Sequence, residues 1–69
     1  MITLEKIKAR LSDAIKQSGL SQAYIAKQVG VCQQAISSYV KGSKMPALDT
    51  LANLCAVLDL DANEILCIK

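Results

Sequence analysis

The sequence contains no histidine, tryptophan or phenylalanine, and tyrosine occurs only twice in its 69 residues. Without histidine, the chain lacks the side chain that most often acts as a general base or binds zinc. Its three cysteines, Cys32, Cys55 and Cys67, include no Cys-x-x-Cys pair and are too few for a four-cysteine zinc site. No pairing of a nucleophile with a base is recognisable. We therefore expect reduced thiols, no metal, no cofactor and no enzymatic activity.

Long hydrophobic runs are absent as well. The longest, Leu54 to Leu58, has five residues, whereas a helix that spans a bilayer needs roughly 18 or more. The first residues lack the apolar stretch of a signal peptide. A length of 69 residues allows one small domain, and a hydrophobic content of 52% is typical of a folded chain. We expect one cytoplasmic domain, residues 1–69, with no membrane partner.

Charge is divided unevenly along the chain. Residues 1–44 carry seven basic and two acidic side chains, whereas residues 45–69 carry one basic and four acidic side chains. A basic first part suits a polyanionic partner such as nucleic acid. An ordinary solvated surface gives similar numbers, so charge alone does not assign a function.

Apolar residues recur every three or four positions along most of the chain, which is the period of an amphipathic helix. The pattern predicts an all-α fold with helices over 4–18, 22–29, 33–41 and 48–58, and a short fifth helix that begins at residue 62. Polar N-caps are expected at Thr3, Ser21 and Asp61, and glycine stops at Gly19, Gly30 and Gly42. The apolar face of the first helix is expected to contain Leu4, Ile7, Leu11, Ala14 and Ile15. That of the fourth helix is expected to contain Leu48, Leu51, Leu54, Cys55 and Leu58.

The helices over 22–29 and 33–41 are separated by three residues, which predicts a helix-turn-helix. Ala26 is small where the two helices must approach each other, and Gly30 can adopt the positive φ of a sharp turn. Val31 and Ile36 fill the angle between the helices. The exposed start of the second helix of this pair is polar, with Gln33, Gln34, Ser37 and Ser38.

With these features, the chain resembles the lambdoid phage repressor and Cro family, the XRE-type (Cro/C1-type) helix-turn-helix domain. The residues that carry the resemblance are Gly19 to Gln22, Ala26, Val29 to Val31, Gln33 to Ile36, Gly42, Pro46, Leu51, Leu54 and Asp61 to Leu66. The resemblance implies a five-helix lambda-repressor-like fold. It further implies a bacterial or phage-encoded repressor-like transcriptional regulator that binds double-stranded DNA at a palindromic operator as a homodimer.

In this family, the second helix of the pair lies in the major groove with its first residues on base edges. The resemblance therefore assigns base reading to Cys32, Gln33, Gln34, Ser37 and Ser38. A glutamine amide can pair bidentately with adenine. Cys32 stands at the N-cap, where the family usually has Ser or Thr. Residues expected to contact phosphates around the bases are Ser21, Gln22, Lys27, Lys41, Ser43 and Lys44, and Gln22 is also expected to brace Gln33.

Two departures from the family pattern affect packing. Many members pair an arginine late in the first helix with a glutamate near the end of the third, whereas this chain has Ile15 and Val40. We expect an apolar contact in place of that ion pair. Ala47 stands where a Ser or Thr often caps the fourth helix, so we expect that helix to start without a side-chain cap.

A homodimer needs a surface of its own, and the acidic last part of the chain is the best candidate. The residues expected to make the contact are Leu60, Ile65, Leu66 and Ile68, although packing of the last helix on the core uses some of them. An alternative function stays open, in which the helix-turn-helix domain binds a protein partner, as an antitoxin does, with or without DNA. The sequence does not give the operator or the direction of regulation.

Overall fold

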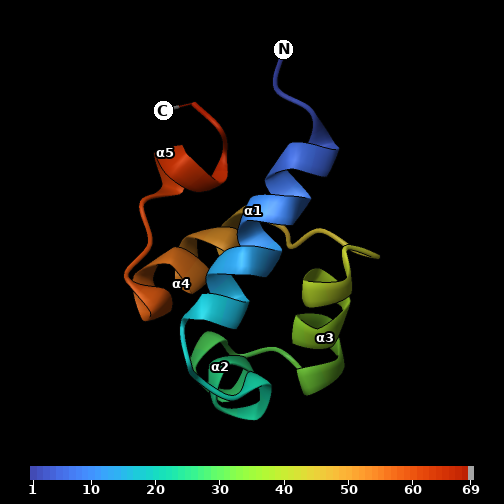
Figure 1. Ribbon diagram of the computed structural model, residues 1–69. Coiled ribbons are helices and arrows are strands. Elements are labelled where there is room, and N and C mark those ends of the chain that lie inside the picture. The colour runs from blue at the N-terminus through green and yellow to red at the C-terminus, as the bar shows by residue number, and fades with distance from the viewer. Residues whose placement is uncertain (69) are drawn as a thin grey trace.

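The computed structural model describes residues 1–68, and this part of the chain forms five α-helices and no strand (Figure 1). They are α1 (Leu4–Gln17), α2 (Gln22–Val29), α3 (Gln33–Lys41), α4 (Leu48–Leu58) and α5 (Ala62–Ile65). The predicted all-α class is confirmed. So are the predicted helix boundaries, except that α1 ends one residue early because Ser18 already belongs to the turn.

The N-terminal caps explain where the helices begin. Thr3, Ser21 and Asp61 each accept a hydrogen bond from a backbone N–H in the first turn of α1, α2 and α5. Cys32 and Ala47 precede α3 and α4 without a side-chain cap, as expected for a thiol and a methyl group. Each of these five residues has the extended backbone of an N-cap.

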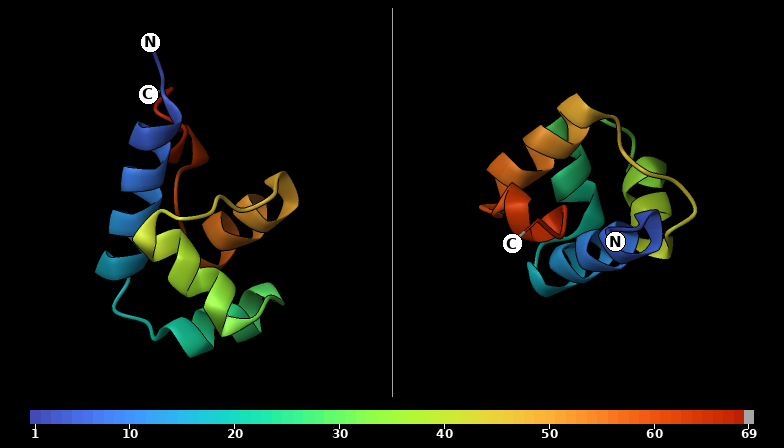
Figure 2. Two further views of the ribbon diagram at one scale, coloured as in Figure 1. Left: turned by 90° about the vertical axis from the view of Figure 1, so that its right-hand side faces the viewer. Right: turned by 90° about the horizontal axis from the view of Figure 1, so that it is seen from above.

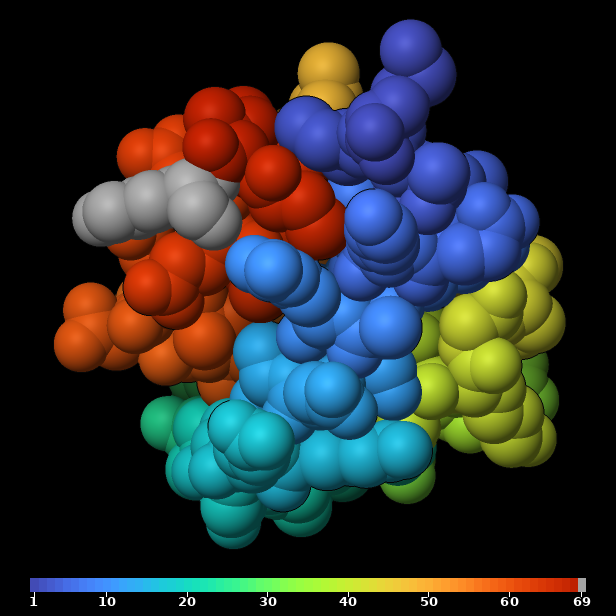
Figure 3. All heavy atoms as spheres, turned by 45° about the horizontal axis from the view of Figure 1, so that its top comes forward, coloured from blue at the N-terminus to red at the C-terminus, as the bar shows by residue number. Residues whose placement is uncertain are grey.

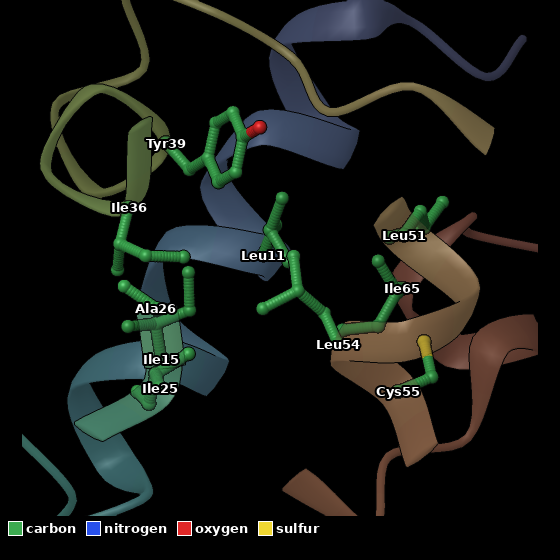
Figure 4. Close-up of a cluster of buried hydrophobic side chains, with 10 residues drawn as sticks. All are labelled: Leu11, Ile15, Ile25, Ala26, Ile36, Tyr39, Leu51, Leu54, Cys55 and Ile65. Carbon is green, nitrogen blue, oxygen red and sulfur yellow. The ribbon is translucent and has the colours of Figure 1, made fainter. Parts of the chain in front are cut away.

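Four side chains from four helices form the centre of the core. Leu11, Ile25, Ile36 and Leu54 are fully buried and come from α1, α2, α3 and α4. Figure 4 shows that Leu11 and Leu54 meet in the middle of this cluster. Ile15 is buried in the same cluster and Val40 packs against that cluster, so both positions are joined to the core. A direct contact between the two side chains stays a prediction.

The prediction was wrong for the first residues of two helices. Leu48 is 84% exposed and Leu4 is 50% exposed, although both were expected to face the core. Side chains of a helix point back toward its N-terminus. A residue at the first helical position therefore points past the end of the helix, where no neighbouring turn covers it. The rest of the α4 stripe follows the prediction, because Leu51, Leu54 and Cys55 are buried.

Helix α1 lies between α3 and α5 and packs against both (Figure 2, right), whereas α2 packs against α3 and α4. The first residues and the last described residues lie beside α5 and the start of α1, and α2 lies at the opposite end of the molecule with the start of α3 (Figures 1 and 2). Within residues 1–68 there is no helix with the length and hydrophobicity that a bilayer crossing requires.

Candidate nucleic-acid interface

A three-residue connector sets the angle between α2 and α3. Gly30 has a φ of +87°, which an L side chain adopts only with strain. This conformation lets the N–H groups of Gly30 and Val31 both donate to the carbonyl oxygen of Ala26, at 2.8 and 3.0 Å. Ala26 is itself buried against the core. The turn predicted from Ala26 and Gly30 is therefore present, and it brings the start of α3 to the surface.

Helix α3 has one face in the core and one in solvent. Ile36 and Tyr39 are buried, whereas Gln33 and Gln34, the first two residues of the helix, are exposed. In residues 1–68, no hydrogen bond within the protein occupies either glutamine amide. Both amides keep their donors and acceptor available for a ligand. The side chains assigned to base reading are thus on a firmly packed helix and point away from the core.

The two serines expected to read bases are less accessible than the glutamines. Ser37 and Ser38 are half-buried on the next turn of α3. The hydroxyl of Ser38 donates a hydrogen bond of 2.9 Å to the carbonyl oxygen of Gln34, which leaves that hydroxyl able only to accept. Cys32 is exposed directly before the two glutamines. Of this group, Cys32, Gln33 and Gln34 therefore have the most accessible side chains.

The residues assigned to phosphate contact lie before α3, at its last position and in the loop after it. Ser21, Lys27, Lys41, Ser43 and Lys44 are exposed and Gln22 is half-buried. The oxygen of Ser21 accepts from the N–H of Tyr24 at 3.1 Å, so its hydroxyl proton remains available. The hydroxyl of Ser43 donates to the carbonyl oxygen of Ser38 at 3.3 Å, and this bond holds the loop after α3 close to that helix.

Gln22 and Gln33 are not hydrogen-bonded to each other in the part of the chain that the structure describes. The brace expected between them is therefore not formed in this structure. Tyr24 on α2 is half exposed and faces away from the core.

The far end of α3 is closed by a hydrogen-bonded turn. Gly42 has a φ of +77°, and its N–H donates to the carbonyl oxygen of Tyr39 at 3.2 Å. The N–H of Ser43 donates to the carbonyl oxygen of Ser38 at 3.0 Å, which completes a Schellman turn. Sequence reasoning missed a further contact at this end, because Ser12 of α1 donates a hydrogen bond of 2.7 Å to the carbonyl oxygen of Val40. The sequence offers one signal for this contact, which is a small polar residue, Ser12, beside Leu11 in an amphipathic helix.

The expected dimer residues divide between core and surface. Ile65 is only 5% exposed, so its side chain is used in the core of the monomer and offers almost nothing to a second chain. Leu60 and Leu66 are half-buried at the edge of that core. Ile68 is 65% exposed. A dimer contact here would therefore involve Leu60, Leu66 and Ile68.

The three cysteines occupy different environments. Cys32 is exposed, Cys67 is half-buried and Cys55 is buried, and none of them forms a disulfide. Burial raises the pKa of the Cys55 thiol, and the nearby Asp61 carboxylate raises it further. Within residues 1–68, no group of three or more potential metal ligands comes together.

Comparison with known proteins agrees with this geometry. Residues 11–65 match the family described as Helix-turn-helix, and that span contains the core, the turn and the exposed start of α3. No curated protein matches the chain. The match to the helix-turn-helix family covers most of the 69 residues, from Leu11 to Ile65. The chain therefore belongs to the Cro/C1-type (XRE) helix-turn-helix family, whose members are DNA-binding domains without enzymatic activity.

Proposed function

We propose that this protein is a sequence-specific transcriptional regulator that binds a palindromic operator as a homodimer, in the manner of a repressor. One observation carries the proposal. Gln33 and Gln34 hold two exposed amides at the start of α3, while the opposite face of that helix is fixed in the core by Ile36 and Tyr39. A helix of this kind can enter the major groove with its first residues on base edges.

The chemistry of the two amides favours adenine. A glutamine side chain can accept a hydrogen bond from N6 of adenine and donate one to N7, and a good bidentate pair of this kind discriminates by about 1–3 kcal/mol. The exposed Cys32 thiol directly before them suits contact with a thymine methyl. Ser37 and Ser38 come one turn later in the helix and suit neighbouring bases or phosphates.

Affinity in this proposal comes mainly from the DNA backbone. Helix α3 has no arginine, so it lacks the side chain that most often contacts guanine. Phosphates are contacted from the last residue of α3 and the loop after it by Lys41, Ser43 and Lys44, and from α2 and its N-cap by Ser21, Gln22 and Lys27. Such contacts position the protein and make binding sensitive to salt.

Dimerisation supplies the remaining affinity. Two copies bound with two-fold symmetry place their reading helices about 34 Å apart, which is one turn of duplex. The apolar edge formed by Leu60, Leu66 and Ile68 is the proposed contact between copies. In this proposal, occupancy of the operator depends on the concentration of the protein and on competition with other proteins for the same site.

Selection of bound sequences from a random duplex library tests this function at near-physiological salt. We expect an enriched palindrome whose half-site centres lie about one helical turn apart. A single enriched half-site would overturn the homodimer but keep base reading. Salt-sensitive binding without any enriched sequence would overturn the regulator and favour a protein partner, as in the antitoxin alternative.

A further inference from the structure

The carbonyl group of Val40, near the C-terminal end of α3, has no partner in the helix or in the turn that closes it. The Schellman turn uses the carbonyl oxygens of Ser38 and Tyr39 as acceptors for the N–H groups of Ser43 and Gly42. The carbonyl oxygen of Val40 comes next and receives neither of these bonds. The last carbonyls of a helix have no partner within the helix, and leaving such a group buried and unpaired destabilises the fold.

Ser12 supplies the missing partner from α1. Its hydroxyl donates to the carbonyl oxygen of Val40 at 2.7 Å, across 28 positions of sequence. Ser12 is 8% exposed, and the other buried side chains among residues 1–68 are apolar except for the Tyr39 hydroxyl and the Cys55 thiol. A short bond from a well-packed side chain allows little variation in distance or direction.

This hydrogen bond restricts the orientation of α3 in a way that the apolar contacts between α1 and α3 do not. The buried side chains Leu11, Ile15 and Ile36 resist separation of the helices, but contacts of this kind are non-directional. A hydrogen bond to one particular carbonyl is directional, so it limits how far α3 can shift along its axis or rotate at that point. Figure 3 shows α1 running between α5 and the end of α3 on this face of the molecule.

A small tilt of α3 at Val40 produces a larger displacement at the start of the helix, where Gln33 and Gln34 lie. Helix α3 has nine residues and is therefore roughly 13 Å long. A tilt of about 5° about its Val40 end moves the backbone of Gln33 by roughly 1 Å, given that length. A designed or natural binding site tolerates about 0.5 Å before its hydrogen bonds weaken.

We infer that Ser12 is a positioning residue for base reading, which holds the start of α3 at the orientation that Gln33 and Gln34 need. The inference rests on the proposed function of those two glutamines. Ser12 touches no DNA in this account and acts only through the carbonyl group of Val40. A change at Ser12 should therefore lower the affinity for the operator more than the affinity for DNA of random sequence.

Ser18 provides a matched control for a change at Ser12. It lies in the turn directly after α1 and is half-buried. Its hydroxyl also donates a hydrogen bond of 2.7 Å to a carbonyl oxygen, that of Ile15, and accepts one from the N–H of Leu20. That bond stays within α1 and its turn, so it does not touch α3. The variants Ser12→Ala and Ser18→Ala both lose one hydroxyl group from the same region.

The first measurement needs no DNA. Amide and carbonyl NMR shifts are compared between wild type, Ser12→Ala and Ser18→Ala. We expect Ser12→Ala to shift the signals of Val40 and also those of Gln33 and Gln34, at the other end of α3. Shift changes that stop at Val40 would overturn the inference, whatever the protein does with DNA.

The second measurement is the ratio of affinity for the selected operator to affinity for random duplex, at a temperature where thermal melting shows each variant to be folded. We expect Ser12→Ala to lower this ratio by about three- to tenfold, a part of what a bidentate base contact is worth, while Ser18→Ala keeps the wild-type ratio. If Ser12→Ala does not fold, Ser12→Cys fills nearly the same space with a weaker donor and should lower the ratio in the same direction.

The outcomes separate the two proposals. Equal ratios for wild type and the Ser12 variant, with wild type discriminating well, would overturn the positioning role alone. A wild-type protein that does not discriminate between operator and random duplex would overturn the proposed function, and the NMR shifts would still decide whether Ser12 positions α3.

Discussion

Arg10 and Glu64 join the two ends of the fold. The Nη1 atom of Arg10 in α1 donates a hydrogen bond of 2.7 Å to the carbonyl oxygen of Glu64 in α5. Helix α5 has only four residues and is far too short to be stable alone. Its position therefore depends on this bond and on the burial of Ile65. Helix α1 thus holds α5 through Arg10 and α3 through Ser12.

Replacing Arg10 tests its role in holding α5. We expect Arg10→Ala to lower the free energy of unfolding by about 1 kcal/mol, a modest value because this bond is exposed. Amide hydrogen exchange should increase most in α5, since its carbonyl loses a partner. Lys16→Ala, which removes another exposed basic side chain of α1, should leave exchange in α5 unchanged. Equal protection of α5 in both variants would contradict this role.

Lys44 should contribute attraction to DNA without sequence preference. The Lys44→Ala variant is expected to bind all duplexes more weakly and to lower the slope of log affinity against log salt by about one, because one phosphate contact is lost. Titrations at several salt concentrations measure this slope. Lys16→Ala is the control, since Lys16 is exposed on α1 and outside the candidate surface. An unchanged slope for Lys44→Ala would remove Lys44 from the phosphate contacts.

Two leucines in α4 should differ sharply in their effect on stability. Leu54 is fully buried, so Leu54→Ala should lower the free energy of unfolding by about 2–5 kcal/mol through lost burial and a cavity. Leu48 is 84% exposed, and Leu48→Ala should change stability by less than about 0.5 kcal/mol. Urea denaturation of both variants measures the contrast. Similar losses at the two positions would contradict the described packing of α4.

The three thiols should react with an alkylating reagent in the order of their exposure. At about pH 8, Cys32 should be labelled first and Cys55 last, because the thiolate is the reactive form. Burial raises the pKa of Cys55, so its neutral form is favoured in the folded state. The fold therefore keeps this contribution to its stability below the ordinary thiol pKa. The contribution is lost as the pH rises through the raised pKa, because the buried thiol then ionises. Mass spectrometry after timed quenching gives the order, and early labelling of Cys55 would contradict its burial.

Local signals were sufficient to predict most of the fold. The glycines at 19, 30 and 42, and the N-caps Thr3, Ser21 and Asp61, mark the helix ends, and the apolar spacing marks the buried faces. The error at Leu48 has a simple cause, since spacing along a helix does not reveal whether the first turn has a neighbour. Ile65 is a related case, because its apolar character alone does not distinguish a core residue from an interface residue.

Contacts between distant segments could not be predicted in the same way. The bonds from Ser12 to Val40 and from Arg10 to Glu64 join a side chain to a backbone carbonyl. A carbonyl acceptor exists at every residue, so the sequence carries no sign of which one is used. The assignment of Gln33 and Gln34 to base reading came from resemblance, whereas their exposure and free amides come from the structure.

The central claim is that Gln33 reads a base, and one comparison tests it most directly. Affinity is measured for wild type, Gln33→Ala and Gln28→Ala, on the selected operator and on the same duplex with its half-sites scrambled. Gln28 is an exposed glutamine of α2 and serves as the matched control. We expect Gln33→Ala to lose about 1–3 kcal/mol on the operator and almost nothing on the scrambled duplex, and Gln28→Ala to behave as wild type. Equal losses for Gln33→Ala on both duplexes would show that Gln33 does not read sequence and would contradict the account.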